Sequence, residues 1–278
     1  MTSDLVDLPA LRAFLVAHAV PGLDDLEVLA DGSTRHRRLV RGDASTGSLL
    51  TVTLPPAAVG IPVIEADVPP DAVAAASAVG RRWLGLDADP APGVAALGDD
   101  PVLGPLVRAR PNLRVPGSTD PFETAVLVVL GQHVSLAAGR VFAARLVAAH
   151  GTRAFPAPDV LASLDPVDLQ RATGTTTAQA RTVVAVARSV ADGLLDLPRQ
   201  EVRAALLSLP GVGPWTADLV ALRALRDPDV FLPGDLVLRQ ALGGLTARQA
   251  ATASEAWRPH RSLAVLHLWT QHAIDPPR

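Results

Sequence analysis

The sequence predicts an α+β protein in which a small mixed α/β domain, residues 1–92, precedes an all-α domain, residues 93–278. Three observations predict this class. Apolar residues form short alternating runs in the first third of the chain and follow helical spacing in the rest. The segment DADPAPG, residues 87–93, is rich in aspartate and proline and marks a linker. The length of 278 residues also exceeds that of a typical single domain.

The first domain is expected to alternate helices and strands. A helical face within residues 8–19 consists of Leu8, Leu11, Phe14 and Leu15. Short β-type runs, bounded by glycine and proline, follow at residues 35–42, 47–56 and 61–70. Residues 71–86 return to a helical pattern, with Asp71 as the expected N-cap.

The second domain is predicted to be helical from about residue 96 onward. Asp120 is the expected N-cap of its first long helix, with Pro121 at the first helical position and Glu123 completing a capping box. Ser135 is expected to cap the next helix, which ends at Gly151. The remaining helical segments are residues 165–172, 177–193, 200–208, 214–226, 236–244 and 262–273.

Composition excludes several kinds of chemistry. Cysteine is absent, which excludes disulfides, thiolate metal sites and cysteine nucleophiles and is typical of cytosolic proteins. Lysine is absent too, so all 25 basic residues are arginine and no lysine side chain can form a Schiff base. Residues 1–8 lack the basic charge of a secretory signal, and no apolar run is long enough for a membrane span. We therefore expect a cytoplasmic protein without a membrane partner.

The charge is distributed unevenly along the chain. Residues 1–100 hold 7 arginines against 14 acidic residues, a net charge of −7. Residues 101–278 hold 18 arginines against 14 acidic residues, a net charge of +4. This asymmetry indicates different partners for the two parts of the chain.

Two predicted helices are joined by the tight turn LPGVGPW, which begins at Leu209. Gly211 and Gly213 permit backbone angles that side chains disfavour, and Pro214 is well suited to the first position of a helix. Such a turn exposes backbone N–H groups at a helix N-terminus, which can bind an anion without basic side chains. An ordinary corner between helices, held by Leu209 and Val212, explains the same pattern.

Asp235 follows a Gly/Pro-rich loop and precedes the helical segment 236–244. This position is typical of a helix N-cap. A capping position also fixes a carboxylate rigidly, so the same residue can present its charge to a cleft. Both interpretations of Asp235 are open at this point.

The segment LPGVGPWTADLVALRALRDPDVFLPGD, residues 209–235, resembles a known motif. It is similar to the helix–hairpin–helix, Gly/Pro-rich loop and aspartate of the DNA glycosylase superfamily, in particular of AlkA-type 3-methyladenine DNA glycosylase II. The segments ARPNLRVPGSTDPFE, LVVLGQHVS and WRPHRSLAVLHLW also resemble that family and occur in its order. The resemblance implies two helical subdomains with a cleft, and a helix–hairpin–helix at about residues 200–226. The first third of the chain resembles the family's small α+β domain.

The resemblance implies a monofunctional enzyme of base-excision repair. It would hydrolyse the N-glycosidic bond of alkylated purines, such as 3-methyladenine and 7-methylguanine, in double-stranded DNA. Asp235 matches the family's catalytic aspartate, which stabilises an oxocarbenium-like transition state or activates water. Related enzymes that also cut the backbone use a lysine or carry a four-cysteine cluster, and neither residue type occurs here. The open alternatives are a non-catalytic DNA- or lesion-binding protein, and a glycosylase for oxidised or deaminated bases.

The resemblance also implies roles for residues around the aspartate. The base pocket would be lined by Trp215, Trp269, Phe14 and Leu219, although core packing explains a lone aromatic residue equally simply. At Leu219 the family can have a tyrosine. The wedge that fills the place of the flipped nucleotide would be His133, with Gln132 beside it.

Main-chain groups of the hairpin have implied roles as well. The N–H groups that would contact DNA phosphate are those of Gly211, Gly213 and Thr216. The carbonyls that match the family's monovalent cation site are those of Leu207, Leu209 and Val212. No other cofactor is expected, because the seven histidines show no metal-ligand spacing and His260 and His267 are expected to pack or cap. We expect a monomer whose acidic first domain makes little contact with DNA.

Overall fold

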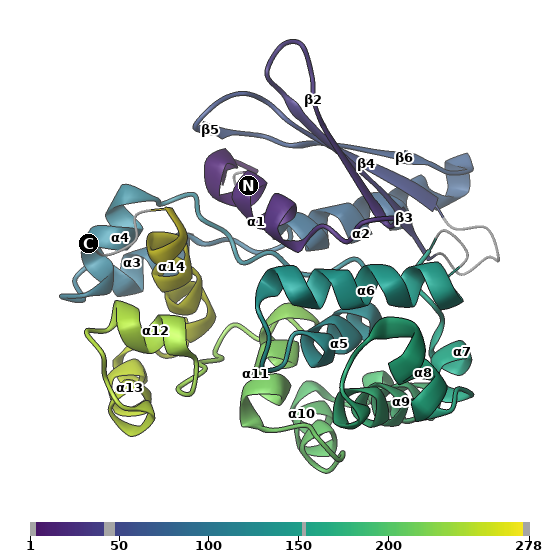
Figure 1. Cartoon of the computed structure of the whole chain (residues 1–278). Coiled ribbons are helices and arrows are strands. Elements are labelled where there is room, and N and C mark those ends of the chain that lie inside the picture. Colours follow the sequence, from purple (N-terminus) through teal and green to yellow (C-terminus); the bar gives the residue numbers. More distant parts are fainter. Residues whose placement is uncertain (1–3, 42–47, 152–153, 275–278) are drawn as a thin grey trace.

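The computed structural model describes residues 4–41, 48–151 and 154–274. Gly42 and Gly47, which bound the first two expected β runs, lie outside the described residues, as does the start of the segment 1–8. The architecture is a small antiparallel sheet packed on helices, followed by a larger helical part, and it confirms the predicted α+β class (Figure 1).

The first part contains a four-stranded antiparallel sheet in the order β2-β3-β4-β6. Its strands are β2 Asp24–Val28, β3 Thr34–Val40, β4 Ser48–Leu54 and β6 Val63–Asp67. A second pair, β1 Val6–Asp7 and β5 Val59–Gly60, lies beside α1 Leu8–His18. The sheet covers α2 Val73–Leu84, whose Trp83 and Leu84 are buried with the apolar side chains of β4.

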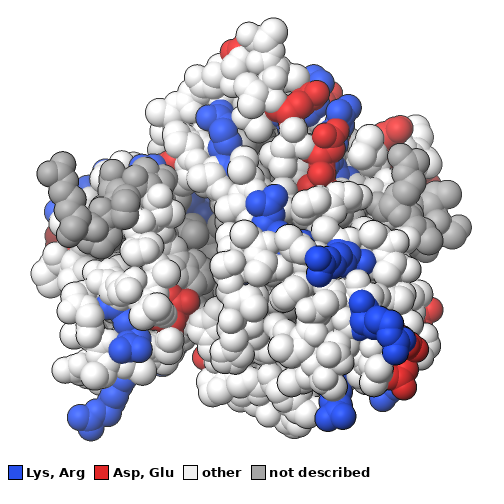
Figure 2. Space-filling view, viewed as in Figure 1, with Lys and Arg blue, Asp and Glu red and all other residues white. Residues whose placement is uncertain are grey.

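Strand β3 has two chemically different faces. Its buried positions are Thr34, His36, Arg38 and Val40, so polar side chains point into the protein. On the other face, Arg35 and Arg37 lie opposite Glu27 and Asp25 of β2 and form ion pairs with them. Figure 2 shows both charge signs together on this part of the surface. The strand β2 was not expected from the sequence, because Asp24, Asp25 and Glu27 mask its alternation.

The expected N-cap at Asp71 is wrong. Asp71 lies within the short 3-10 helix Pro70–Ala72, and α2 begins only at Val73, after Ala72. No side chain caps the N-terminus of α2. The preceding prolines account for the difference, because Pro69 and Pro70 favour a separate 3-10 turn before the helix.

The helical part has two apolar cores that share one helix. The first core joins α5 Pro121–Leu130, α6 Leu136–His150, α9 Thr177–Ala191 and α10 Arg199–Leu207. The second joins α3 Ala91–Leu97, α4 Leu103–Ala109, α12 Leu236–Ala241, α13 Ala247–Ser254 and α14 Arg261–Ile274. Helix α11, Pro214–Arg223, contributes to both: Ala217 and Val220 belong to the first core, and Ala221 and Leu222 belong to the second.

The remaining helices, α7 Pro158–Ala162 and α8 Pro166–Thr173, pack on α9. Helix α3 begins at Ala91, within the segment 87–93 that was expected to be a linker. The domain boundary at 92/93 therefore stays a prediction. No helix in the described part of the chain is long and apolar enough to cross a membrane.

The N-caps of α5 and α6 are the residues predicted from the sequence. Asp120 accepts hydrogen bonds from the backbone N–H groups of Phe122 and Glu123, and Ser135 accepts one from Ala138. The expected capping box at Asp120 is wrong, however. The carboxylate of Glu123 forms an ion pair with Arg38 of β3 instead of returning to the backbone of Asp120.

Candidate active site

The hairpin between α10 and α11 requires glycine at residue 211. Gly211 has a φ of +82°, and a Cβ there would overlap Oγ1 of Thr182 on α9. The Thr182 hydroxyl donates a hydrogen bond to the carbonyl of Pro210 at 3.1 Å, which holds the turn against α9. Gly213 has an ordinary extended φ of −95° and is open to solvent.

The hairpin presents unused N–H groups. Gly213 is the N-cap of α11, and no side chain caps this helix. Within the described chain, the amides of Gly211, Gly213 and Thr216 donate to no other protein group. Together with the helix dipole, these N–H groups form a site suited to an anion.

The carbonyls of Leu207, Leu209 and Val212 fit a monovalent cation by their chemistry. They lie at the C-terminal end of α10 and in the turn that follows, where helix carbonyls lack intrahelical partners. The Leu209 carbonyl accepts one hydrogen bond, from the N–H of Val212 at 3.2 Å, and keeps a second lone pair. The described residues hold no cluster of histidine and carboxylate side chains that could bind a metal ion.

The Asp235 carboxylate is held by three N–H donors. Its Oδ1 accepts hydrogen bonds from the backbone of Leu238 at 3.0 Å and from the indole Nε1 of Trp269 at 3.2 Å. Its Oδ2 accepts one from the indole Nε1 of Trp215 at 3.1 Å. Asp235 is therefore an N-cap of α12 and also joins the two tryptophans that the resemblance assigns to the same pocket. Asp235 itself is partly buried, whereas the next residue, Leu236, is 62% exposed.

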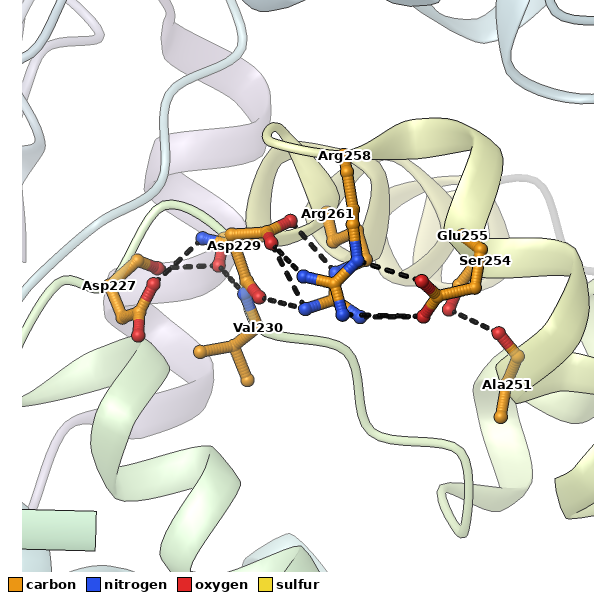
Figure 3. Close-up of polar contacts among 9 residues, drawn as sticks. Asp227, Asp229, Val230, Ala251, Ser254, Glu255, Arg258 and Arg261 are labelled. Atoms are coloured by element: carbon orange, nitrogen blue, oxygen red, sulfur yellow. Dashed lines mark hydrogen bonds and ion pairs between the residues drawn. The ribbon is translucent and has the colours of Figure 1, made fainter. Parts of the chain in front are cut away.

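The loop before Asp235 is fixed to the start of α14 (Figure 3). Arg258 and Arg261 both form ion pairs with Asp229, and Glu255 pairs with both arginines. The buried hydroxyl of Ser262 accepts a hydrogen bond from the Val230 N–H at 3.0 Å and donates one to the Asp227 carbonyl at 2.6 Å. These contacts set the position from which the loop continues to Asp235.

A cavity of about 640 Å³ adjoins Asp235. Its walls come from β3, α1, α2, α5, α6, α11, α12, α14 and the loop before α5, and Figure 2 shows a hollow between the helical lobes of Figure 1. All four residues expected in the base pocket line this cavity: Phe14, Trp215, Leu219 and Trp269. Residues from three distant parts of the sequence are thus brought to one space.

The structure separates the two residues expected to form the wedge. His133 is exposed in the turn between α5 and α6, with a φ of 59° that non-glycine residues seldom adopt. Gln132 instead donates from Nε2 to the Gly211 carbonyl at 3.1 Å and to the Thr216 hydroxyl at 2.6 Å. Its side chain is thereby fixed to the hairpin, so Gln132 connects the His133 turn to the hairpin rather than pointing outward.

Sequence reasoning missed several charged side chains in the cavity wall, which are Asp7, Arg38, Arg114, Glu123, Arg140 and Arg223. Two groups among them differ in their partners. One consists of Arg38 and Glu123 with the neighbouring Asp24, and in it Arg38 forms ion pairs with both carboxylates. Burial raises the pKa of Glu123 to about 7 against the opposing charge of Arg38. The other is Arg223, at the end of α11. The spacing of Trp215, Leu219 and Arg223, four residues apart, was a usable signal that all three share one helix face.

The histidines expected to pack behave differently from one another. His267 is buried, and neither ring nitrogen has a partner among the described residues. Burial lowers the pKa of His267 to about 4, so the ring is neutral at pH 7. His260 lies at the start of α14 and lines a second, smaller cavity of about 120 Å³.

Comparison with known proteins gives consistent results. Residues 6–120 match the family described as the AlkA N-terminal domain. The chain is 40% identical to the probable bifunctional transcriptional activator/DNA repair enzyme AlkA of Mycobacterium tuberculosis, in a match that covers 95% of this chain and 55% of that protein. The chain thus spans about half the length of this relative.

Two further similarities concern a shorter relative and a solved structure. The chain is 37% identical to DNA-3-methyladenine glycosylase 2 of Escherichia coli, over 63% of this chain and 66% of that protein. Its fold is similar to that of a 3-methyladenine DNA glycosylase from Archaeoglobus fulgidus, with a TM-score of 0.80, 21% identity and coverage of 97% and 96%. Together with the hairpin and the aspartate that follows it, these matches show that the chain belongs to the AlkA-type 3-methyladenine DNA glycosylase II family of helix–hairpin–helix proteins.

Proposed function

We propose that this protein is a monofunctional DNA glycosylase that excises alkylated purines, of the 3-methyladenine and 7-methylguanine type, from double-stranded DNA. The observation that carries the proposal is the Asp235 carboxylate, held by two indole N–H groups at the edge of a cavity of about 640 Å³. That volume is in the usual range for a site that encloses a small ligand. Family membership supports the same activity.

The hairpin is suited to hold the DNA strand. The free amides of Gly211, Gly213 and Thr216 can each donate to a phosphate oxygen, which needs no basic side chain. The carbonyls of Leu207, Leu209 and Val212 would hold a monovalent cation, which would supply positive charge near that phosphate. His133, exposed in the neighbouring turn, would occupy the gap left by the flipped nucleotide.

The cavity is suited to a base that has left the stack. An enzyme that acts on the glycosidic bond must extrude the nucleotide, so the base enters the cavity while the sugar stays near its edge. The hydrogen bonds to Asp235 fix both indoles, Trp215 and Trp269, with their rings lining the cavity. Aromatic walls attract a cationic base by stacking and cation–π interaction.

The proposed chemistry uses one carboxylate. Alkylation at N3 or N7 makes the purine cationic, so the bond from C1′ to the base nitrogen breaks with its electron pair going to the base. The base leaves neutral, and positive charge develops on the sugar. The Asp235 carboxylate stabilises that charge and orients the water that adds to C1′, and the water then loses a proton. No general acid is needed for a leaving group that is already cationic.

The absence of lysine supports hydrolysis without backbone cleavage. A lyase step begins with an amine that attacks C1′ and forms a Schiff base. Borohydride added during turnover should therefore trap no covalent complex between this protein and a lesion-containing duplex. A trapped complex would assign the protein a lyase activity.

The decisive experiment is the release of 3-methyladenine and 7-methylguanine from methylated DNA by the native protein and by Asp235→Asn. Asparagine also caps helices well, so the variant should fold and bind DNA. We expect its single-turnover rate to fall by about 10²-fold or more, because the negative charge is lost.

Asp165→Asn is the matched control. Asp165 caps α8 through the Val167 N–H at 2.7 Å and does not line the cavity. This variant should keep the native rate. Equal rates for the native protein and Asp235→Asn would reject the catalytic role. If the native protein binds DNA but releases neither base, a panel of duplexes with oxidised or deaminated bases separates another specificity from a non-catalytic binding protein.

A further inference from the structure

Arg223 places a positive charge in the cavity wall at the opposite end of α11 from the hairpin. Trp215, Leu219 and Arg223 lie four residues apart on one face of this helix, and all three line the cavity. The helix rises 1.5 Å per residue, so Trp215 and Arg223 are separated by about 12 Å along its axis. Trp215 contacts Asp235, and Arg223 lies about two turns further along α11 from that contact.

The Arg223 guanidinium has no anionic partner within the described part of the chain. It lies over the ring of Phe14, 4.1 Å from the ring centroid. Burial, together with repulsion from Arg226, lowers the pKa of Arg223 to about 9, which still leaves the group charged at neutral pH. The N–H donors of this arginine are thus available to a molecule in the cavity.

The nearest charged neighbours are also arginines: Arg140 lines the cavity and acts on His18, and Arg226 repels Arg223. The ring of His18 contacts that of Phe14 at a centroid distance of 4.2 Å. Burial and the charge of Arg223 lower the pKa of His18 to about 4, so His18 is neutral at pH 7. Along α11 the cavity wall thus runs from Trp215, which holds the Asp235 carboxylate, past Leu219 to the Arg223 guanidinium.

We propose that Arg223 determines specificity by donating a hydrogen bond to an acceptor oxygen on the inward edge of the bound purine. This inference rests on the proposed function, in which Asp235 faces the sugar and the base extends inward along α11. Arginine has five N–H donors and no acceptor. A carbonyl at position 6 of the purine can pair with it, whereas an amino group there cannot. The cavity should then prefer 7-methylguanine over 3-methyladenine.

The surroundings of Arg223 favour this role over a structural one. Arg223 is half-buried and has no carboxylate partner among the described residues, an arrangement that costs folding free energy, so packing alone does not account for it. A donor left unpaired by the wrong ligand produces strong discrimination, whereas added apolar contact produces little. Phe14 supports the guanidinium from one side and leaves its N–H edge free to donate.

The test measures both bases in the same reaction. Methylated DNA is treated with the native protein and with Arg223→Met, and the released 7-methylguanine and 3-methyladenine are separated and counted. We expect the ratio of the two rates to fall about tenfold in the variant, because one hydrogen bond from a charged donor is lost. Arg37→Met, which changes an exposed arginine outside the cavity, should leave the ratio unchanged.

A binding measurement separates this inference from the proposed function. Free 7-methylguanine and free 3-methyladenine are titrated against the fluorescence of the tryptophans, three of which line the cavity. Preferential binding of 7-methylguanine by the native protein, lost in Arg223→Met, supports the inference even if no base is released from DNA. Equal preference in the two proteins overturns the inference and leaves the proposed function intact. If Arg223→Met weakens the binding of both bases equally, the inference is also overturned, since that result indicates a structural role.

Discussion

Two of the arginines that line the cavity, Arg38 and Arg223, have opposite surroundings. Arg38 lies between the carboxylates of Asp24 and Glu123 and is nearly enclosed. Arg223 faces an aromatic ring and has no carboxylate partner among the described residues. The first charge is satisfied by the protein, and the second is left for a ligand. The comparison teaches that burial alone does not identify a functional charge, and that the partners of the charge do.

The Arg38 group joins two parts of the chain. Asp24 and Arg38 come from β2 and β3, whereas Glu123 comes from α5. The Nε2 of His36 donates to Asp24 at 2.8 Å, and the Val20 N–H donates to the same carboxylate at 2.7 Å. Although burial acts to raise it, the pKa of Asp24 is lowered by the charge of Arg38 and the hydrogen bond from His36. The sheet is thus attached to the helical part by a paired, dehydrated cluster.

The largest expected effect is that of Arg38→Met. This change leaves Asp24 and Glu123 buried without their cation, which should lower the free energy of unfolding by about 3–5 kcal/mol. Denaturant unfolding at pH 7 measures it. Arg37→Met, at the next residue but on the exposed face, should change stability by less than about 0.5 kcal/mol. Equal effects of the two changes would remove the structural role assigned to Arg38.

An intermediate effect is expected from the titration of Glu123. Its pKa is about 7 in the folded protein, against an ordinary value of 4.5, because burial disfavours the charged form. The folded protein therefore retains a proton that the unfolded chain releases above pH 4.5, and the stability from that proton is lost as pH rises through 7. Glu123→Gln should gain stability relative to the native protein between pH 5 and 8, by at most about 3 kcal/mol.

This prediction is best measured as a difference between the two proteins. His18 and His267 have pKa values lowered to about 4, so their contributions weaken the native state as pH falls below 6.5, and they are present in both proteins. Subtracting the two pH profiles isolates Glu123. A difference that is constant from pH 5 to 8 would show that Glu123 is ionised throughout this range.

The smallest expected effect is that of Arg223→Met on stability. Removing an unpaired buried charge should leave the free energy of unfolding unchanged or raise it by about 1 kcal/mol. Thermal unfolding of the variant and of the native protein measures the difference. A decrease in the free energy of unfolding as large as that of Arg38→Met would mean that both arginines stabilise the fold, which contradicts the difference described above.

Features encoded by local spacing could be predicted from the sequence. The turn at Gly211, the capping position of Asp235 and the helices around them depend on residues close together in the chain. The resemblance then identified Phe14 and Trp269 as cavity residues, although 255 positions separate them. Periodicity alone would have assigned both to an apolar core.

Features that depend on distant polar partners could not be predicted. Glu123 fits a capping box locally, but Arg38, 85 residues earlier, provides a stronger ionic partner. Strand β2 lacks an apolar pattern because its acidic residues pair with arginines of β3. Gln132 is drawn to the hairpin by Thr216, 84 residues later. In each case the deciding contact forms only when the chain has folded.

The placement of helix α11 has a consequence for the proposed recognition of a base in DNA. One end of this helix forms the turn suited to the phosphate, and the other end carries Arg223. Residues of this helix are packed in both apolar cores, so the helix is held in a fixed position. In the proposed function, the distance along α11 between the hairpin and Arg223 would then set how far a base can extend into the cavity from the phosphate held at the turn.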